Sequence, residues 1–260
     1  MWVPVTDRRP FLVSVALLSA LAWLALLLWG ASPYAWLLNH QALDTVPAQS
    51  AGRLLIVVTG WSVMTVAMML PTSLPLINLF AALTRRHPGH SRLVGLLIAG
   101  YLSVWSFFGL LVHVADLGLH LAVAAAPILR DLAGLLGAGT LLIAGVYQFT
   151  PLKRRCLEQC RSPFSFVMSH WHGRQPLTEA LWLGLHHGLY CLGCCWSLML
   201  LMFAVGVGNV AWMLALGAVM ATEKNLPQGR RLSAPLGIVL LGAGTFVLLA
   251  MVLPRALGSS

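Results

Sequence analysis

Long apolar runs, separated by short segments rich in proline and basic residues, are the feature that most constrains this chain. Several of the runs reach the roughly 20 residues that a helix needs to cross a hydrocarbon core of about 30 Å. Only 9% of the 260 residues are charged, whereas a soluble domain normally has about 25%. Because a backbone in lipid must satisfy its own polar groups, the sequence predicts an all-α fold, a polytopic transmembrane helical bundle.

The apolar runs divide the chain into about seven expected spans within a single integral membrane domain, residues 1–260. The sixth run is short and could be re-entrant, so six spans remain an alternative. No internal repeat or low-complexity tract suggests a second domain. The expected spans are residues 11–30, 54–83, 93–115, 132–150, 177–204, 207–222 and 234–253.

The net charge of +9 comes from basic residues in the loops between these runs. If the N-terminus is cytoplasmic, every Lys and Arg except Arg53, Arg130 and Arg255 falls on the cytoplasmic side, as the positive-inside rule requires. No nucleic-acid-binding motif accompanies the charge. We therefore expect the lipid bilayer as a partner, and no nucleic acid.

The stretch "HHGLYCLGCCWSLMLLM", residues 186–202, places soft ligands inside the fifth expected span. At about 100° per residue, these side chains share a helical face roughly 100° wide. They are His187, Cys191, Cys194, Cys195 and Met202. One ion could be held by His187, Cys191 and either Cys194 or Cys195, whereas Met202 is too far along the axis.

Thiolate and thioether ligands favour Cu(I), with zinc or iron as alternatives. The stripe therefore predicts a metal site, most simply for copper. Two other interpretations remain open. Cys191 and Cys194 form a C-x-x-C, the spacing of thiol–disulfide exchange motifs, and buried Cys and Met also serve as ordinary apolar filling.

A second candidate cluster lies in the basic loop "PLKRRCLEQCRSPF". Cys156 and Cys160 are four residues apart, so a short helix would put both on one side. His170 and His172 follow in "HWHG". This set predicts a second metal site, and the alternative is a basic loop on anionic lipid in which the cysteines are incidental.

Two further features are weaker candidates. His113, Asp116 and His120 fall on one helical face and could form a metal or proton site, or simply lie in water beyond the third span. Three methionines precede Pro71, where the prolines of "MTVAMMLPTSLPLINLF" should kink the second span; they could line a copper passage or only pack in the core. These are Met64, Met68 and Met69.

Adjacent Glu223 and Lys224 end the sixth expected span. Neighbouring residues do not face each other on a helix. Each therefore has a partner elsewhere, or both merely mark the membrane interface.

At these residues the chain resembles a family of bacterial integral membrane proteins labelled "predicted metal-binding", a domain of unknown function. The matching pieces extend over most of the chain from the second span onward. They are "AMMLP", "GVYQFTPLKRRCLEQCRSP", "GLYCLGCCWSLMLL", "GNVAWM" and "EKNLP". The resemblance implies metal binding and a multi-pass location in the inner membrane. His172 departs from the pattern, which has arginine there.

The sequence thus favours an integral membrane protein that binds or handles Cu(I), with a metal-donor or metal-acceptor protein as partner. It indicates no catalytic residue and leaves open whether the chain is an enzyme. A membrane thiol–disulfide oxidoreductase and a membrane subunit of a larger metalloenzyme are the alternatives. A transporter and a structural scaffold are also conceivable.

Overall fold

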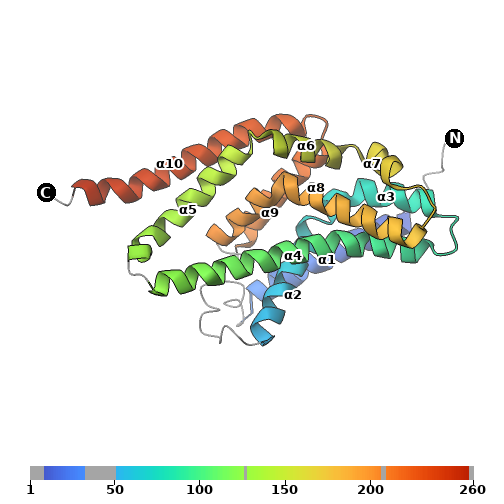
Figure 1. Ribbon diagram of the computed structural model, residues 1–260, viewed down its shortest axis with the longest axis horizontal. Helices are drawn as coiled ribbons and strands as arrows, with labels where there is room; N and C mark the ends of the chain where they lie inside the picture. The colour runs from blue at the N-terminus through green and yellow to red at the C-terminus, as the bar shows by residue number, and fades with distance from the viewer. Residues whose placement is uncertain (1–8, 33–50, 126–127, 206–208, 258–260) are drawn as a thin grey trace.

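A computed structural model describes residues 9–32, 51–125, 128–205 and 209–257. In these residues the chain consists of helices joined by short turns and loops and contains no strand, which confirms the all-α prediction (Figure 1). The elements are α1 (Arg9–Gly30), α2 (Ala51–Met68), η4 (Pro71–Ser73), α3 (Leu74–Thr84), α4 (His90–Ala125), α5 (Ile128–Tyr147), α6 (Pro151–Arg161), α7 (Pro163–His170), α8 (Pro176–Val205), α9 (Val210–Asn225), η5 (Gly229–Leu232) and α10 (Ser233–Leu257).

Helix α8 lies at the centre and packs along α4, while α6 crosses its middle and α10 runs beside α5 (Figure 1). Glycines permit the closest of these contacts. A Cβ at Gly184 of α8 would collide with the backbone carbonyl of Leu97 in α4, and one at Gly100 of α4 would meet the carbonyl of Leu181. Small residues that let helix backbones approach are typical of membrane helix pairs.

Within the described ranges, three helical segments are long and apolar enough to cross a membrane: His90–Val123, Pro176–Met202 and Gly229–Leu253. The total is five if each of two bent helix pairs counts as one span. This is fewer than the seven or six predicted. Helix α9 has 16 residues, which is only about 24 Å of helix, and α1 contributes a shorter apolar segment, Leu17–Gly30. The number of spans stays a prediction.

The two bent pairs have identifiable causes. The helices Val58–Met68 and Pro71–Thr84 meet at 44°, where proline was predicted to kink the second span. The helices Leu135–Tyr147 and Pro151–Arg161 meet at 66°. At this second bend Thr150 caps α6 by accepting a hydrogen bond from the Lys153 backbone N–H, with Pro151 in the first turn, a favourable start for a new helix.

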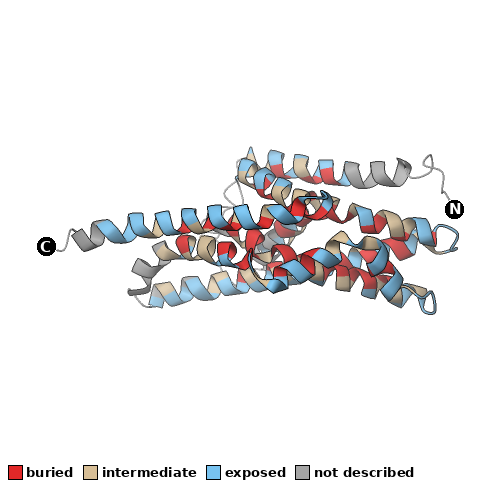
Figure 2. Ribbon diagram, turned by 90° about the horizontal axis from the view of Figure 1, so that it is seen from above, coloured by how far each residue is buried: buried red, intermediate tan, exposed pale blue. Residues whose placement is uncertain are grey.

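Burial is uneven along the molecule. Figure 2 shows buried residues concentrated where α8 meets its neighbours, whereas α10 is largely exposed. Large apolar side chains on α10 lie open, including Ile238 and Val239, each 65% exposed, and Phe246, 73% exposed. Extended apolar surface of this kind marks an interaction site for protein or lipid.

Candidate metal centre

All five cysteines of the chain meet where α6 crosses α8, and all five are free thiols. The two clusters that appear separate in the sequence therefore form one. Cys160 Sγ of α6 lies 4.0 Å from Cys194 Sγ of α8. Cys156 packs against Gly193, where a Cβ would come within 2.6 Å of its sulfur. Glycine at position 193 thus lets the two cysteine-bearing helices touch.

The sequence of α6 places both of its cysteines against α8. Lys153, Cys156, Leu157 and Cys160 follow the i, i+3, i+4, i+7 spacing of one helical face, and the first three are buried. The predicted short helix is therefore present. The sequence of α6 is enough to predict which face of this helix is buried. The sequences of α6 and α8 do not predict that the two helices pack against each other.

Methionine enters the cluster from the break between α2 and η4. Met69 Sδ lies 3.8 Å from Cys195 Sγ. The backbone carbonyl of Met69 does not accept the helical hydrogen bond from the Ser73 N–H, because that N–H donates to the Leu70 carbonyl. The hydroxyls of Tyr101 and Thr72 donate to this carbonyl at 3.2 and 2.8 Å, so the proline-induced break is satisfied by neighbours, as a membrane helix requires.

We call this group the sulfur centre, and it comprises Cys160, Cys191, Cys194, Cys195 and Met69. Cys191, Cys194, Cys195 and Met69 are at most 2% exposed, whereas Cys160 is half-buried. The thiols of Cys194 and Cys195 donate to the carbonyl of Cys191 at 3.1 and 2.8 Å. The three cysteines of α8 are thus soft donors held in fixed positions on one helix.

A lysine also enters the sulfur centre. Lys224 of α9 places its ammonium 3.0 Å from Cys191 Sγ and 3.7 Å from Cys195 Sγ. The hydroxyl of Tyr101 lies 3.0 Å from the same Cys191 sulfur. A cation at this distance stabilises negative charge on sulfur.

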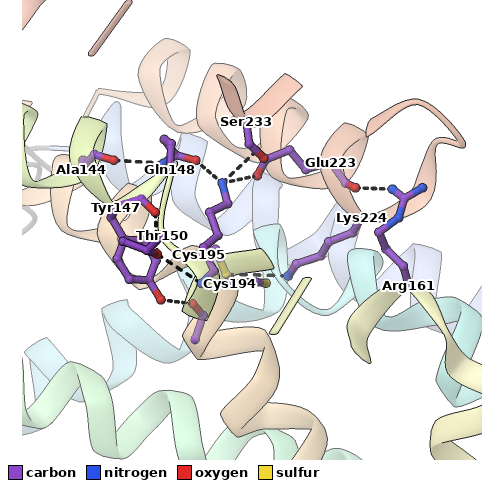
Figure 3. Close-up of polar contacts among 12 residues, drawn as sticks. Ala144, Tyr147, Gln148, Thr150, Arg161, Cys194, Cys195, Glu223, Lys224 and Ser233 are labelled. Atoms are coloured by element: carbon purple, nitrogen blue, oxygen red, sulfur yellow. Dashed lines mark hydrogen bonds and ion pairs between the residues drawn. The ribbon is translucent and has the colours of Figure 1, made fainter. Parts of the chain in front are cut away.

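Adjacent Glu223 turns away from the sulfur centre and binds Lys153 of α6. Figure 3 shows the side chains of Glu223 and Lys224 leading in different directions, Lys224 toward Cys194 and Cys195. Lys153 Nζ lies 2.8 and 2.9 Å from the two carboxylate oxygens of Glu223, and Ser233 donates to one of them at 2.7 Å. Of the two alternatives left open by the sequence for Glu223 and Lys224, the structure therefore shows the first, in which each has a separate partner.

The same buried network ties α9 to α6, to the start of α10 and to the turn that follows α5. Lys153 Nζ also donates to Gln148, the residue directly after α5. Arg161 donates to the Glu223 carbonyl and, at 2.9 Å, to the Pro227 carbonyl. These bonds hold the end of α9 in place, and with it the starting point of the Lys224 side chain.

His187, predicted as a ligand beside Cys191, is buried and turned to other partners. Its Nε2 lies 3.1 Å from Ser73 Oγ, and its ring stacks on Tyr101 with centroids 5.5 Å apart. Its Nδ1 is buried without a hydrogen-bond partner in the described part of the chain. Among the described residues, no three His, Cys, Asp or Glu side chains converge closely enough to hold one ion together.

The secondary candidates divide between core and periphery. Met64 and Met68 are buried in α2, and Met202 is buried near the end of α8. His170 bonds to Ser169 and to the Phe166 carbonyl.

His170 also faces His186 across a groove that Trp182 and Arg174 help to line. His172 is exposed, and its backbone N–H donates to Glu179. His170 is thus the last residue of α7, and His172 lies in the loop between α7 and α8.

The outer candidates lie away from the sulfur centre. His113 is buried and Asp116 half-buried on α4. His113 lies twelve residues beyond Tyr101 on one helix, which is about 18 Å along the axis. They cannot share an ion with the cysteines. The His120 side chain lies outside the described residues.

Comparison with known proteins identifies the family. A family model described as "PpoB2: Copper chaperone" matches residues 58–247. The chain belongs to the PpoB2 copper chaperone family. No curated protein and no solved structure matches it. Membership in PpoB2 agrees with the expected metal-binding family and with copper as the metal concerned.

The match to PpoB2 covers every element that builds the sulfur centre. Sequence reasoning named the four cysteines of the centre and Met69, but it missed Tyr101 and the destination of Lys224. The burial of Lys153 could have been predicted from the helical spacing of α6, because Lys153 lies on the same face as Cys156 and Cys160. No local signal identified Tyr101.

Proposed function

We propose that this chain is an integral membrane copper chaperone that carries Cu(I) as cargo between the thiolates of Cys160 and Cys194. The single observation that carries the proposal is the 4.0 Å separation of their sulfurs across α6 and α8. With metal–thiolate bonds of about 2.3 Å, two sulfurs sharing one ion lie about 3.8 Å apart at a tetrahedral angle and about 4.6 Å apart in a line. The observed distance falls inside that interval.

The surrounding donors support Cu(I) over harder ions. Cys191, Cys195 and Met69 add sulfur and no carboxylate, a set that selects soft monovalent copper. In this proposal they surround the two-coordinate ion with soft sulfur and place no hard donor beside it. His187 remains a candidate further ligand, because its Nδ1 is buried and unpaired in the described structure.

Cys156 is a candidate ligand at the edge of the centre. It lies on the same face of α6 as Cys160 and packs against Gly193. In our proposal it supports the approach of α6 to α8 and holds copper only in passage.

The proposed membrane location is supported by the length of the apolar helices and by the exposure of their apolar side chains. Three to five spans and an exposed apolar face on α10 would be unfavourable in water, since hydrophobic surface costs roughly 25 cal/mol per Å². The charge pattern supports a cytoplasmic N-terminus and an inner-membrane location. Cargo enters and leaves through contact with a metal-donor or metal-acceptor protein.

The test is copper binding by detergent-purified, reduced protein, measured by competition with a Cu(I) chelator. We expect one Cu(I) per chain. Cys160→Ser and Cys194→Ser should each weaken binding by at least about a hundredfold, since each removes one of two thiolates. Met202→Leu, a buried sulfur on the same helix, is the matched control and should bind like wild type.

Reduced wild-type protein that binds no Cu(I) would contradict the proposal. It would favour the thiol–disulfide alternative if a quinone or protein oxidant then removed two free thiols per chain. Variants of Cys160 and Cys194 that bind like wild type would instead move the site to other residues.

A further inference from the structure

Lys224 is the one cation that contacts the sulfur centre among the described residues, and none of its described partners is a carboxylate. It reaches three sulfur atoms and one hydroxyl. The partners of its Nζ are Cys191 Sγ at 3.0 Å, Thr72 Oγ1 at 3.2 Å, Cys195 Sγ at 3.7 Å and Met69 Sδ at 3.9 Å.

The neighbouring carboxylate does not balance this charge. Glu223 is engaged by Lys153 at 2.8 Å, and both side chains of that pair are at most 2% exposed. Lys224 itself is only 6% exposed. A buried ammonium is strongly disfavoured unless negative charge lies beside it. The charge that balances Lys224 must therefore come from the sulfur centre.

We infer that Lys224 determines the metal specificity of the sulfur centre, fixing it for one monovalent ion and rejecting divalent ions. This inference rests on the proposed function, because it concerns the same site. Two thiolates, one Cu(I) and the ammonium together carry no net charge. Two thiolates, one divalent ion and the ammonium carry one uncompensated positive charge in a buried place, which is costly.

Position acts in the same direction as charge. Zinc in proteins takes four ligands in a tetrahedron. The Lys224 ammonium lies against Cys191 and Cys195, the thiols that would complete such a set around Cys160 and Cys194. In agreement with this, no group of three His, Cys, Asp or Glu side chains in the described residues is arranged so that it could hold a metal ion. Only the thiolates of Cys160 and Cys194 then remain as ligands. Two thiolates are enough for Cu(I), whereas zinc would lack two of its four ligands.

The experiment compares Cu(I) and Zn(II) affinities of the full-length purified protein, each set by a competing chelator. The variants are Lys224→Met, which keeps length and loses charge, and Lys224→Arg, which keeps charge. We expect Lys224→Met to lower the ratio of Cu(I) to Zn(II) affinity by at least about tenfold. Lys224→Arg should stay nearer to wild type.

The matched control removes a positive charge outside the sulfur centre. Arg230→Gln takes away an exposed cation that is paired with Glu158, and it should not change the affinity ratio. A Lys224→Met protein that folds with an unchanged ratio would overturn the inference while leaving copper binding intact.

Wild-type protein gives a second, independent readout should Lys224→Met fail to fold. It must bind Zn(II) at least about a hundredfold more weakly than Cu(I). Comparable zinc and copper affinities in wild type would overturn the inference alone. Absence of Cu(I) binding in wild type would overturn the proposed function and this inference with it.

Discussion

Cys160 Sγ lies 4.0 Å from Cys194 Sγ, although the two residues are 34 positions apart and belong to helices that cross. Cys160 is half-buried, whereas Cys194 is 2% exposed. The pair therefore joins the outside of the centre to its interior. A route for cargo from a partner protein would begin at Cys160.

This difference in exposure predicts an order of thiol reactivity. With a membrane-permeable maleimide, Cys160 should be modified first, ahead of the four buried cysteines, because access limits alkylation. Cu(I) loading should slow its modification by at least about tenfold, since a metal-bound sulfur is not a free nucleophile. Mass spectrometry of peptides over time measures both effects. Equal rates with and without copper would argue against Cys160 as a ligand.

The buried ion pair should matter far more than the exposed one. Glu223→Gln leaves the Lys153 ammonium buried without its counter-charge, which costs about 3–5 kcal/mol and lowers the unfolding midpoint by roughly 10 °C for a chain of this size. Thermal unfolding in detergent measures it. The control is Glu158→Gln, whose carboxylate lies 3.3 Å from Arg230 with both side chains more than half exposed; it should cost less than about 1 kcal/mol.

A midpoint for Glu223→Gln within 2 °C of the Glu158→Gln value would mean that the Glu223 network does not hold α6, α9 and α10 together. Lys224 would then need another reason for its position.

The close approach of α4 and α8 predicts a strong effect at Gly184. In Gly184→Ala the new methyl would meet the carbonyl of Leu97, so the helices must separate and lose packing, at a cost of about 1–3 kcal/mol. Gly95→Ala is the control, because a Cβ there meets nothing within 4 Å and the change gains up to about 1 kcal/mol of helix propensity. Unfolding midpoints should move in opposite directions; a shared direction would contradict the packing.

The exposed face of α10 predicts contact with lipid. Phe246 lies near the middle of α10 and is 73% exposed. A lysine there should cost about 2.5–3.5 kcal/mol in a membrane helix, so Phe246→Lys should reduce the fraction that resists alkaline extraction from membranes. Phe246→Leu should behave like wild type. If Phe246→Lys instead improved yield without loss from the membrane fraction, α10 would not face lipid.

At the break near Pro71, the local sequence predicts one feature and the tertiary structure decides another. The sequence alone predicts a kink there, because proline removes a backbone donor whatever surrounds it. The destination of the freed Met69 carbonyl is set by Tyr101, which is 32 residues away. A local pattern carries no information on such a partner.

The same distinction between local sequence and tertiary structure holds for the neighbours Glu223 and Lys224. Helix geometry alone requires that they point in different directions. That one meets Lys153 and the other Cys191 depends on how α9 docks between α6 and α8.

The amino-acid sequence by itself determined the helices, the proline break and the presence of soft ligands on two helical faces, because helical period, backbone donors and side-chain chemistry are local properties. Tertiary structure alone decided that both cysteine clusters form one centre, that His187 turns to Ser73 and Tyr101, and that Lys224 lies among the sulfurs. The physical reason is that these contacts join distant segments whose approach depends on glycines at crossings and on one buried ion pair.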